Sequence, residues 1–303
     1  MTTYSRFQTA YRPFQTFSAY LDFFLPRMFV HEQWPVYREY LHFIFGKPFD
    51  RLHRQGLDID LDKDVDAYST REIVVNRACL LGYEPCVRMA RDRFAELRAN
   101  CSGEHQLLSD IECNKIPFYL RQYIYAAAIE YGTDEDFAFL LEKWRIEHYM
   151  LERDRIFHGM CFTGSRSNSD QMWNALLENR HREHIFARSV SCSKKLTAQT
   201  LIIDFFEDRP ELLKELFKSQ SAKMTLQPLL MLGLRQTTTR EQVERVTTML
   251  APLGNNSLAV DRLMLGHNIN QVRYRLQWRN HMGAYIIGNA SEAIIEMKKW
   301  NSD

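Results

Sequence analysis

Apolar residues recur at helical spacing on both sides of a short break, Gly82-Tyr-Glu-Pro85. On each side they fall three or four positions apart, which is the period of one helix face. Glycine readily ends a helix and proline opens one, so this stretch predicts two helices joined by a tight turn. The apolar positions are Ile73, Val74, Ala78 and Leu81, then Val87, Ala90, Phe94 and Leu97.

The same pattern returns along the rest of the chain. A helical run over 120–131 ends at Gly132, and Thr133 then precedes three acidic residues. A capping threonine followed by acids is typical of a helix start, where the helix dipole favours negative charge. Alternation typical of a strand is clear only at 57–66, an acidic connector. Further helical units are expected at 170–179, 197–206, 210–217, 226–234, 239–250 and 268–278.

Paired helices with short loops, repeated every 30 to 45 residues or so, are typical of α-solenoids. We therefore predict an all-α fold, a HEAT/armadillo-like superhelix of antiparallel helix pairs. No low-complexity linker divides the chain, so residues 1–303 are expected to form one domain. We expect residues 1–20 to be a partner-binding or flexible segment and residues 290–303 a flexible tail.

Charge and hydropathy argue against two classes of protein. The formal net charge is +1, which disfavours nucleic-acid binding, and no apolar run reaches the roughly 18 residues that span a membrane. Two basic-aromatic clusters, at 180–188 and 273–279, keep a nucleic-acid-binding solenoid as a weak alternative to a solvated helix face. The second cluster comprises Arg273, Tyr274, Arg275, Trp278 and Arg279.

Three stretches of the chain carry a resemblance to a known family, ACLLGYEPCVRMARDRFAEL at 78–97, IPFYLRQYIYAAAIEYGTDEDFAFLLEKW at 116–144 and ERDRIFHGMCFTGS at 152–165. They resemble the C-terminal helical domain of zinc aminopeptidases of the aminopeptidase N and endoplasmic-reticulum aminopeptidase type. The similarity extends over most of 15–280 and is specific between about 75 and 165. The resemblance implies a helical lid domain of the kind that accompanies a zinc catalytic domain.

The catalytic motifs of that family do not occur in this sequence. Zinc binding by H-E-x-x-H needs two histidines on one helix face, but the stretch that begins His31-Glu32 has Pro35 in the fifth position. No Met-Glu-Asn exopeptidase motif occurs either. The aspartates from Asp58 to Asp66 lack the glycine and glutamate of a calcium loop. We predict no enzyme activity, no catalytic or metal-binding residues and no cofactor.

Cys79 and Cys86 flank the first predicted turn. A zinc clip would need a second ligand pair nearby, and a redox motif would be C-x-x-C. The hairpin brings the two cysteines close, and the resemblance implies a disulfide, with two packed thiols as the alternative. The six cysteines are too scattered to require oxidation. The resemblance also implies a second bridge to Cys161, but its partner position is Ala126.

The absent bridge and the lack of an apolar N-terminal signal favour an intracellular location, cytoplasmic or nuclear. A secreted or lumenal location would follow if a signal segment had been removed. Three glycosylation sequons, at Asn100, Asn255 and Asn289, point weakly the other way.

We expect a non-catalytic scaffold or adaptor that binds a protein partner or an extended peptide on the solenoid surface. The alternative is a regulatory or lid portion that acts with a separate catalytic aminopeptidase subunit. Aromatic residues at roughly helical spacing near the N-terminus are either a partner interface or the core of the first helices. They include Tyr4, Phe7, Tyr11, Phe14 and Phe17.

Overall fold

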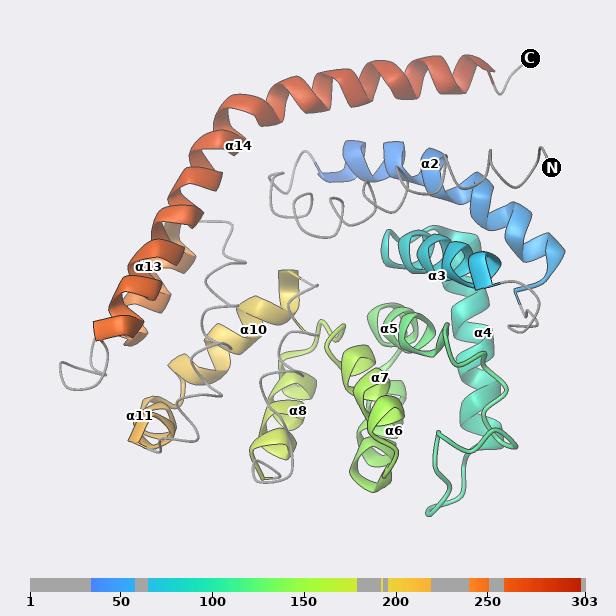
Figure 1. Ribbon diagram of the computed structural model, residues 1–303, viewed down its shortest axis with the longest axis horizontal. Helices are drawn as coiled ribbons and strands as arrows, with labels where there is room; N and C mark the ends of the chain where they lie inside the picture. The colour runs from blue at the N-terminus through green and yellow to red at the C-terminus, as the bar shows by residue number, and fades with distance from the viewer. Residues whose placement is uncertain are drawn as a thin grey trace.

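The computed structural model describes residues 34–57, 65–178, 192, 196–218, 240–250 and 259–300. Throughout these ranges the regular elements are helices, which confirms the all-α prediction (Figure 1). In chain order they are α2 (Trp34–Gln55), α3 (Val65–Leu80), α4 (Glu84–Asn100), α5 (Arg121–Tyr131), α6 (Asp134–Ile146), α7 (Met150–Met160), α8 (Arg166–Glu178), α10 (Leu196–Glu207), α11 (Pro210–Lys218), α13 (Arg240–Leu250) and α14 (Ala259–Trp300).

Successive helices pack on their neighbours in a curved row, as in an α-solenoid (Figure 1). α3 packs on α4 and α5, and α5 packs on α6 and α7. α8 continues the row to α10, and α10 contacts both α11 and α13. From α3 to α10, each helix therefore packs against elements close to it in sequence.

The α3–α4 hairpin forms where the glycine and proline predict it. Gly82 adopts a positive φ of 76°, a backbone conformation that costs glycine little, and Pro85 lies in the first turn of α4. A disulfide joins Cys79 to Cys86 across the turn, with 5.0 Å between their Cα atoms. Both cysteines are fully buried, so the bridge is part of the core.

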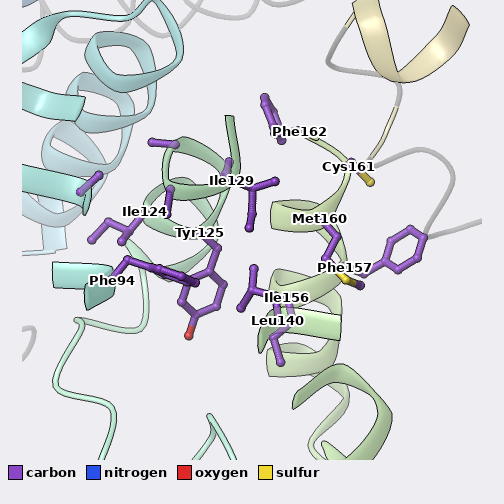
Figure 2. Close-up of a cluster of buried hydrophobic side chains, with 14 of the residues drawn as sticks. Phe94, Ile124, Tyr125, Ile129, Leu140, Ile156, Phe157, Met160, Cys161 and Phe162 are labelled. Carbon is purple, nitrogen blue, oxygen red and sulfur yellow. The ribbon is translucent and has the colours of Figure 1, made fainter. Parts of the chain in front are cut away.

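The core is centred on α5, most of whose residues are buried. Figure 2 shows Tyr125 of α5 between Phe94 of α4 and the side chains of α6 and α7. At Gly159 of α7, an added Cβ would lie 2.6 Å from the Cβ of Tyr125. Because only glycine allows so close an approach, α5 and α7 pack with their backbones nearly in contact.

The start of α6 has the predicted cap. The carboxylate of Asp136 accepts hydrogen bonds from the Thr133 backbone N–H at 2.9 Å and from its hydroxyl at 3.3 Å. The acidic first turn also faces the positive end of the helix dipole.

All six cysteines form disulfides, so the expectation that they need not be oxidised is wrong. Cys101 joins Cys113 within the long loop between α4 and α5. Cys161, at the end of α7, joins Cys192 ahead of α10. The family bridge that would need a cysteine at position 126 is absent, but Cys161 has another partner. The argument from a lost bridge for an intracellular location therefore has no basis.

α14 differs from the sequence prediction. Instead of a short unit at 268–278 and a flexible tail from 290, one helix runs from Ala259 to Trp300. Its first part contacts α13, and its last part lies along α2, so that it connects the two ends of the row (Figure 1). The contact with α2 is a separate apolar cluster, supplemented by an ion pair between Lys298 and Glu39. Its buried members are Tyr37, Leu41, Phe45 and Ala290.

We predict that Ile294→Asp detaches the end of α14 from α2, whereas Ile295→Asp does not. Ile294 lies one turn after Ala290 and is 6% exposed, whereas its neighbour Ile295 is 56% exposed. Placing a carboxylate at the buried position should lower the free energy of unfolding by about 2–3 kcal/mol. Urea denaturation measures this loss, and amide hydrogen exchange shows whether it lies in α2 and α14. Equal effects of both variants would contradict the packing.

Candidate binding pocket

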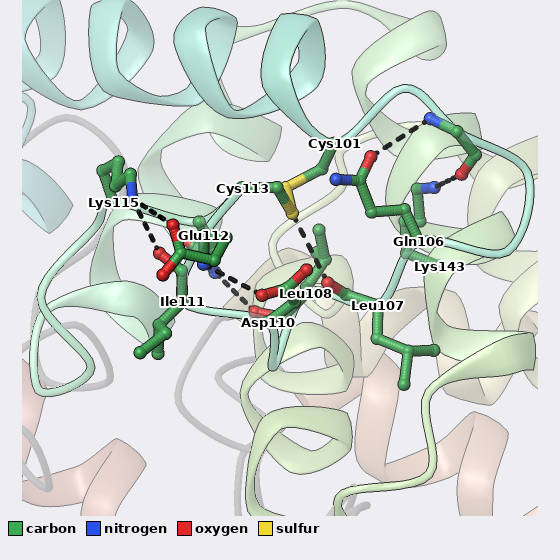
Figure 3. Close-up of a disulfide and its surroundings, with 12 residues drawn as sticks. Cys101, Gln106, Leu107, Leu108, Asp110, Ile111, Glu112, Cys113, Lys115 and Lys143 are labelled. Atoms are coloured by element: carbon green, nitrogen blue, oxygen red, sulfur yellow. Dashed lines mark hydrogen bonds and ion pairs between the residues drawn. A yellow bond between two sulfur atoms is a disulfide. The ribbon is translucent and has the colours of Figure 1, made fainter.

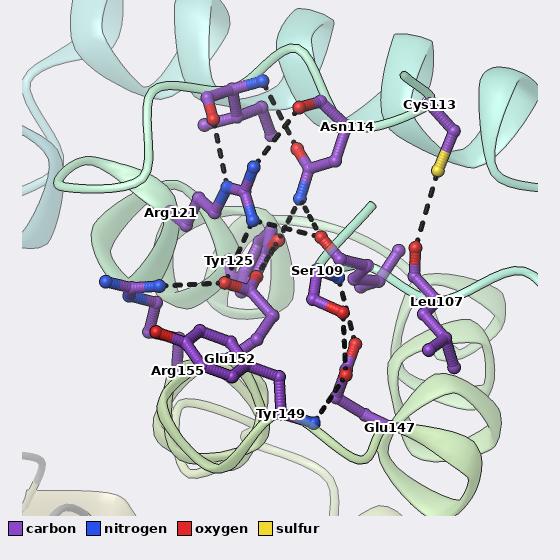
Figure 4. Close-up of polar contacts among 12 residues, drawn as sticks. Leu107, Ser109, Cys113, Asn114, Arg121, Tyr125, Glu147, Tyr149, Glu152 and Arg155 are labelled. Carbon is purple, nitrogen blue, oxygen red and sulfur yellow. Dashed lines mark hydrogen bonds and ion pairs between the residues drawn. The ribbon is translucent and has the colours of Figure 1, made fainter. Parts of the chain in front are cut away.

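A buried carboxylate, that of Glu152 in α7, organises the loop before α5. Its oxygens accept hydrogen bonds from the Tyr125 hydroxyl at 2.7 Å, Arg121 Nη1 at 3.0 Å and Arg155 Nη1 at 2.9 Å (Figure 4). Two arginines compensate one fully buried acid, so its desolvation is offset by charge-assisted hydrogen bonds. Burial, with the Glu152 charge adding to it, raises the pKa of Tyr125 well above its usual value. Tyr125 therefore stays a hydrogen-bond donor.

Arg121 carries the effect of this carboxylate into the loop. Its guanidinium donates to the carbonyl oxygens of Ile116, Leu108 and Asn114 at 3.0–3.2 Å. Asn114 in turn donates to the Leu108 carbonyl at 2.7 Å and to the Tyr125 hydroxyl at 2.9 Å. These bonds give an irregular segment the partners that a helix would otherwise supply.

The other half of the loop is held from α6 and the turn after it. The buried carboxylate of Glu147 accepts hydrogen bonds from the Ser109 backbone N–H and hydroxyl, both at 2.9 Å. Lys143 donates to the Gly103 carbonyl at 2.7 Å. Figure 3 shows this loop around the Cys101–Cys113 disulfide.

The fixed loop presents two aromatic residues, Phe118 and Tyr119, beside α3 and α7. They line a hollow of about 260 Å³. Tyr119 is held by a 2.5 Å hydrogen bond from its hydroxyl to the Leu57 carbonyl and by edge contact with Tyr68. Phe118 is 44% exposed and stacks on Tyr68, with the Arg155 guanidinium 5.7 Å from its ring centroid. The remaining lining comes from Glu72, Gln122, Leu151, Asp154 and His158.

The pocket combines apolar surface with a charged rim. Phe118 and Leu151 are large apolar side chains left exposed at its edge. Arg155 is paired with Glu152, and the acidic residues Glu72 and Asp154 also line the hollow. Such a hollow suits an apolar or aromatic side chain with a basic neighbour.

A larger hollow of about 650 Å³ lies along α4, but its chemistry differs. Four of its charged residues form ion pairs with each other, Arg88 with Glu84 and Arg98 with Asp136. Charges compensated within the chain in this way attract a ligand less strongly than uncompensated ones. We therefore take the aromatic pocket as the candidate site.

None of the residues singled out from sequence is among the described residues that line this pocket. The N-terminal aromatics Tyr4, Phe7, Tyr11, Phe14 and Phe17 lie outside the described residues, as does the basic cluster at 180–188. On α14, Arg273 and Tyr274 are exposed, with Tyr274 67% exposed and not anchored in a core. The side chains of Arg275, Trp278 and Arg279 are also outside the described part.

Metal and membrane chemistry find no support within the described ranges. No group of three histidine, cysteine or acidic residues there is placed to hold a metal ion. Among the described helices, none combines the length and apolar character needed to cross a bilayer. Residues 58–64 of the acidic connector are outside these ranges.

We predict that Glu152→Gln destabilises the fold far more than Glu84→Gln. Removing the charge leaves Arg121 buried without its counter-ion, a loss of about 3 kcal/mol or more in the free energy of unfolding. Glu84 forms an exposed pair with Arg88, so the control should change little. Chemical denaturation measures the free energy of unfolding of both variants. Similar losses would show that the buried network contributes no more to stability than an exposed ion pair.

Comparison with known proteins places these features in a family. None of the curated proteins compared with the chain matches it. A family model does match, the one described as the ERAP1-like C-terminal domain, over residues 1–270. That range holds the solenoid, the pocket and the first part of α14. The resemblance to endoplasmic-reticulum aminopeptidases is thereby confirmed, and the chain belongs to the family of ERAP1-like C-terminal domains.

Proposed function

We propose that this chain is a non-catalytic binding scaffold that holds a protein partner or an extended peptide at the aromatic pocket. The supporting observation is Phe118, a large aromatic side chain left half exposed on a loop held by buried hydrogen bonds. A pre-formed aromatic surface on a rigid support binds without a large ordering cost. An aromatic or aliphatic side chain of the ligand fills the hollow.

The rim selects the neighbouring residue of the ligand. Glu72 accepts a 2.6 Å hydrogen bond from the Tyr123 hydroxyl, which holds its carboxylate in place beside the hollow. Asp154 of α7 also lines the hollow. We propose that a lysine or arginine next to the inserted side chain pairs with the Glu72 carboxylate. Because the pairing is near the surface, it would contribute mainly specificity and weaken with salt.

The second candidate is a lid or regulatory portion that works with a separate zinc aminopeptidase subunit. Family membership favours it, because the family takes its description from an aminopeptidase domain. The sequence contains no H-E-x-x-H, so under this proposal the catalytic zinc would come from the other subunit. The two candidate functions differ in the protein that the chain binds, because in both the chain itself is not catalytic.

We predict that Phe118→Ala weakens peptide binding at least tenfold. The probe is a peptide selected on the wild-type chain from a random library, and its affinity is measured by calorimetry. Tyr285→Ala, which removes an aromatic ring 66% exposed on α14, is the matched control and should bind normally. Peptides that bind both variants as tightly as wild type would refute the pocket as the binding site.

We predict no aminopeptidase turnover by the purified chain. The assay uses amino-acid amide substrates with added zinc, and a chelator serves as the control. Chelator-sensitive turnover would overturn the non-catalytic proposal. Purification of the chain from its own cells then separates the two candidates, because a zinc aminopeptidase in constant ratio to it supports the lid and other constant partners support the scaffold.

A further inference from the structure

One sequon lies at a place where a sugar chain would fit the fold. Asn100, in Asn-Cys-Ser, is the last residue of α4 and is exposed, as is Ser102. Cys101 between them is buried and bonded to Cys113. The acceptor amide thus points outward from a backbone that the disulfide holds in place.

The disulfides indicate the compartment in which this sequon would be read. The six cysteines of the chain form three bridges, and structural disulfides persist in oxidising compartments such as the lumen of the endoplasmic reticulum. Asn-x-Ser/Thr is modified in that same compartment. The sequon and the disulfides are separate observations, and both indicate passage through the secretory pathway.

A hollow of about 320 Å³ lies directly beside Asn100. One wall is the face of α4 that carries Arg93, Glu96 and Leu97, and the other is the segment from Cys113 to Ile116. Its volume is at the lower end for small-molecule sites. Leu97 and Ile116 are buried at the hollow, whereas the charged side chains of Arg93, Glu96 and Lys115 offer partners to the hydroxyls of a sugar.

We propose that Asn100 carries an N-linked glycan whose first N-acetylglucosamine lies in this hollow. In the transfer, the side-chain amide nitrogen forms a bond to the anomeric carbon of a lipid-pyrophosphate-linked oligosaccharide. The bond from that carbon to the pyrophosphate oxygen breaks, the lipid pyrophosphate leaves with the electron pair, and the amide loses one proton. The oligosaccharide donor and its transferase come from the secretory pathway.

The other two sequons serve as comparisons. Asn255 lies outside the described residues. Asn289 is exposed within α14, next to Ala290, which is buried against α2. No described hollow is lined by Asn289, so Asn289 is the control for a sequon without a receiving surface.

The test is site mapping on the full chain, expressed in animal cells behind a cleavable secretory leader. Peptide-N-glycosidase in heavy-oxygen water converts a glycosylated asparagine to labelled aspartate, which peptide mass spectrometry locates. We expect the label at Asn100, lost in Ser102→Ala and kept in Asn289→Gln. Both the secreted and the cell-retained chain are mapped, so that a variant that is retained still gives a result. Unlabelled Asn100 in disulfide-bonded wild-type chain overturns the proposal.

A second measurement tests the place of the first sugar. Lys115 lies on the wall of the hollow, and its reactivity toward an amine reagent should rise several-fold once the glycan is removed. Lys298, on the far end of α14, is the control and should not change. If Lys115 is equally reactive before and after removal, the glycan does not occupy the hollow. Neither result depends on the peptide-binding proposal.

Discussion

The geometry of the middle of this solenoid depends on one buried negative charge. The Glu152 carboxylate attracts Arg121 and Arg155, and Arg121 in turn holds three carbonyl groups of the loop between α4 and α5. The carbonyl groups of that irregular loop lack the hydrogen-bond partners that a helix would supply, so the shape of the loop follows from these side-chain hydrogen bonds. The aromatic pocket stands on the same support, since Arg155 both bonds Glu152 and lies beside the Phe118 ring. Core stability and the binding surface are therefore coupled through a single side chain.

Local signals in the sequence were sufficient for much of the fold. The hairpin at Gly82 and Pro85 and the cap at Thr133 each depend on a few adjacent residues, and both are present. The pairing of the other cysteines is not a local signal, because six cysteines allow fifteen pairings and spacing alone does not choose among them, as for Cys101–Cys113. At Cys161 the resemblance implies a partner at position 126, which is an alanine, and it gives no indication of the bridge to Cys192.

The pocket could not be found by the same means. Phe118 and Tyr119 stood within a stretch already noted for its resemblance, but the walls opposite them come from α3 and α7. Only the packing of α5 between these helices brings Tyr68 and Leu151 to the same hollow. α14 is a separate case: it contacts α13 at one end and α2 at the other, so it does not pack on one partner along its whole length. The period of its pattern therefore predicted only a fragment of the helix.

All three disulfides are local, with sequence separations of 7, 12 and 31 residues. Cys79–Cys86 and Cys101–Cys113 close segments between adjacent helices, Cys161–Cys192 encloses the segment that contains α8, and none joins one end of the solenoid to the other. Under mechanical tension, the disulfides therefore do not prevent neighbouring helix pairs from separating one after another. The segments inside each bridge keep their length throughout. The disulfides therefore shorten the maximum length to which this chain can be extended, but they do not add resistance to the separation of its helix pairs.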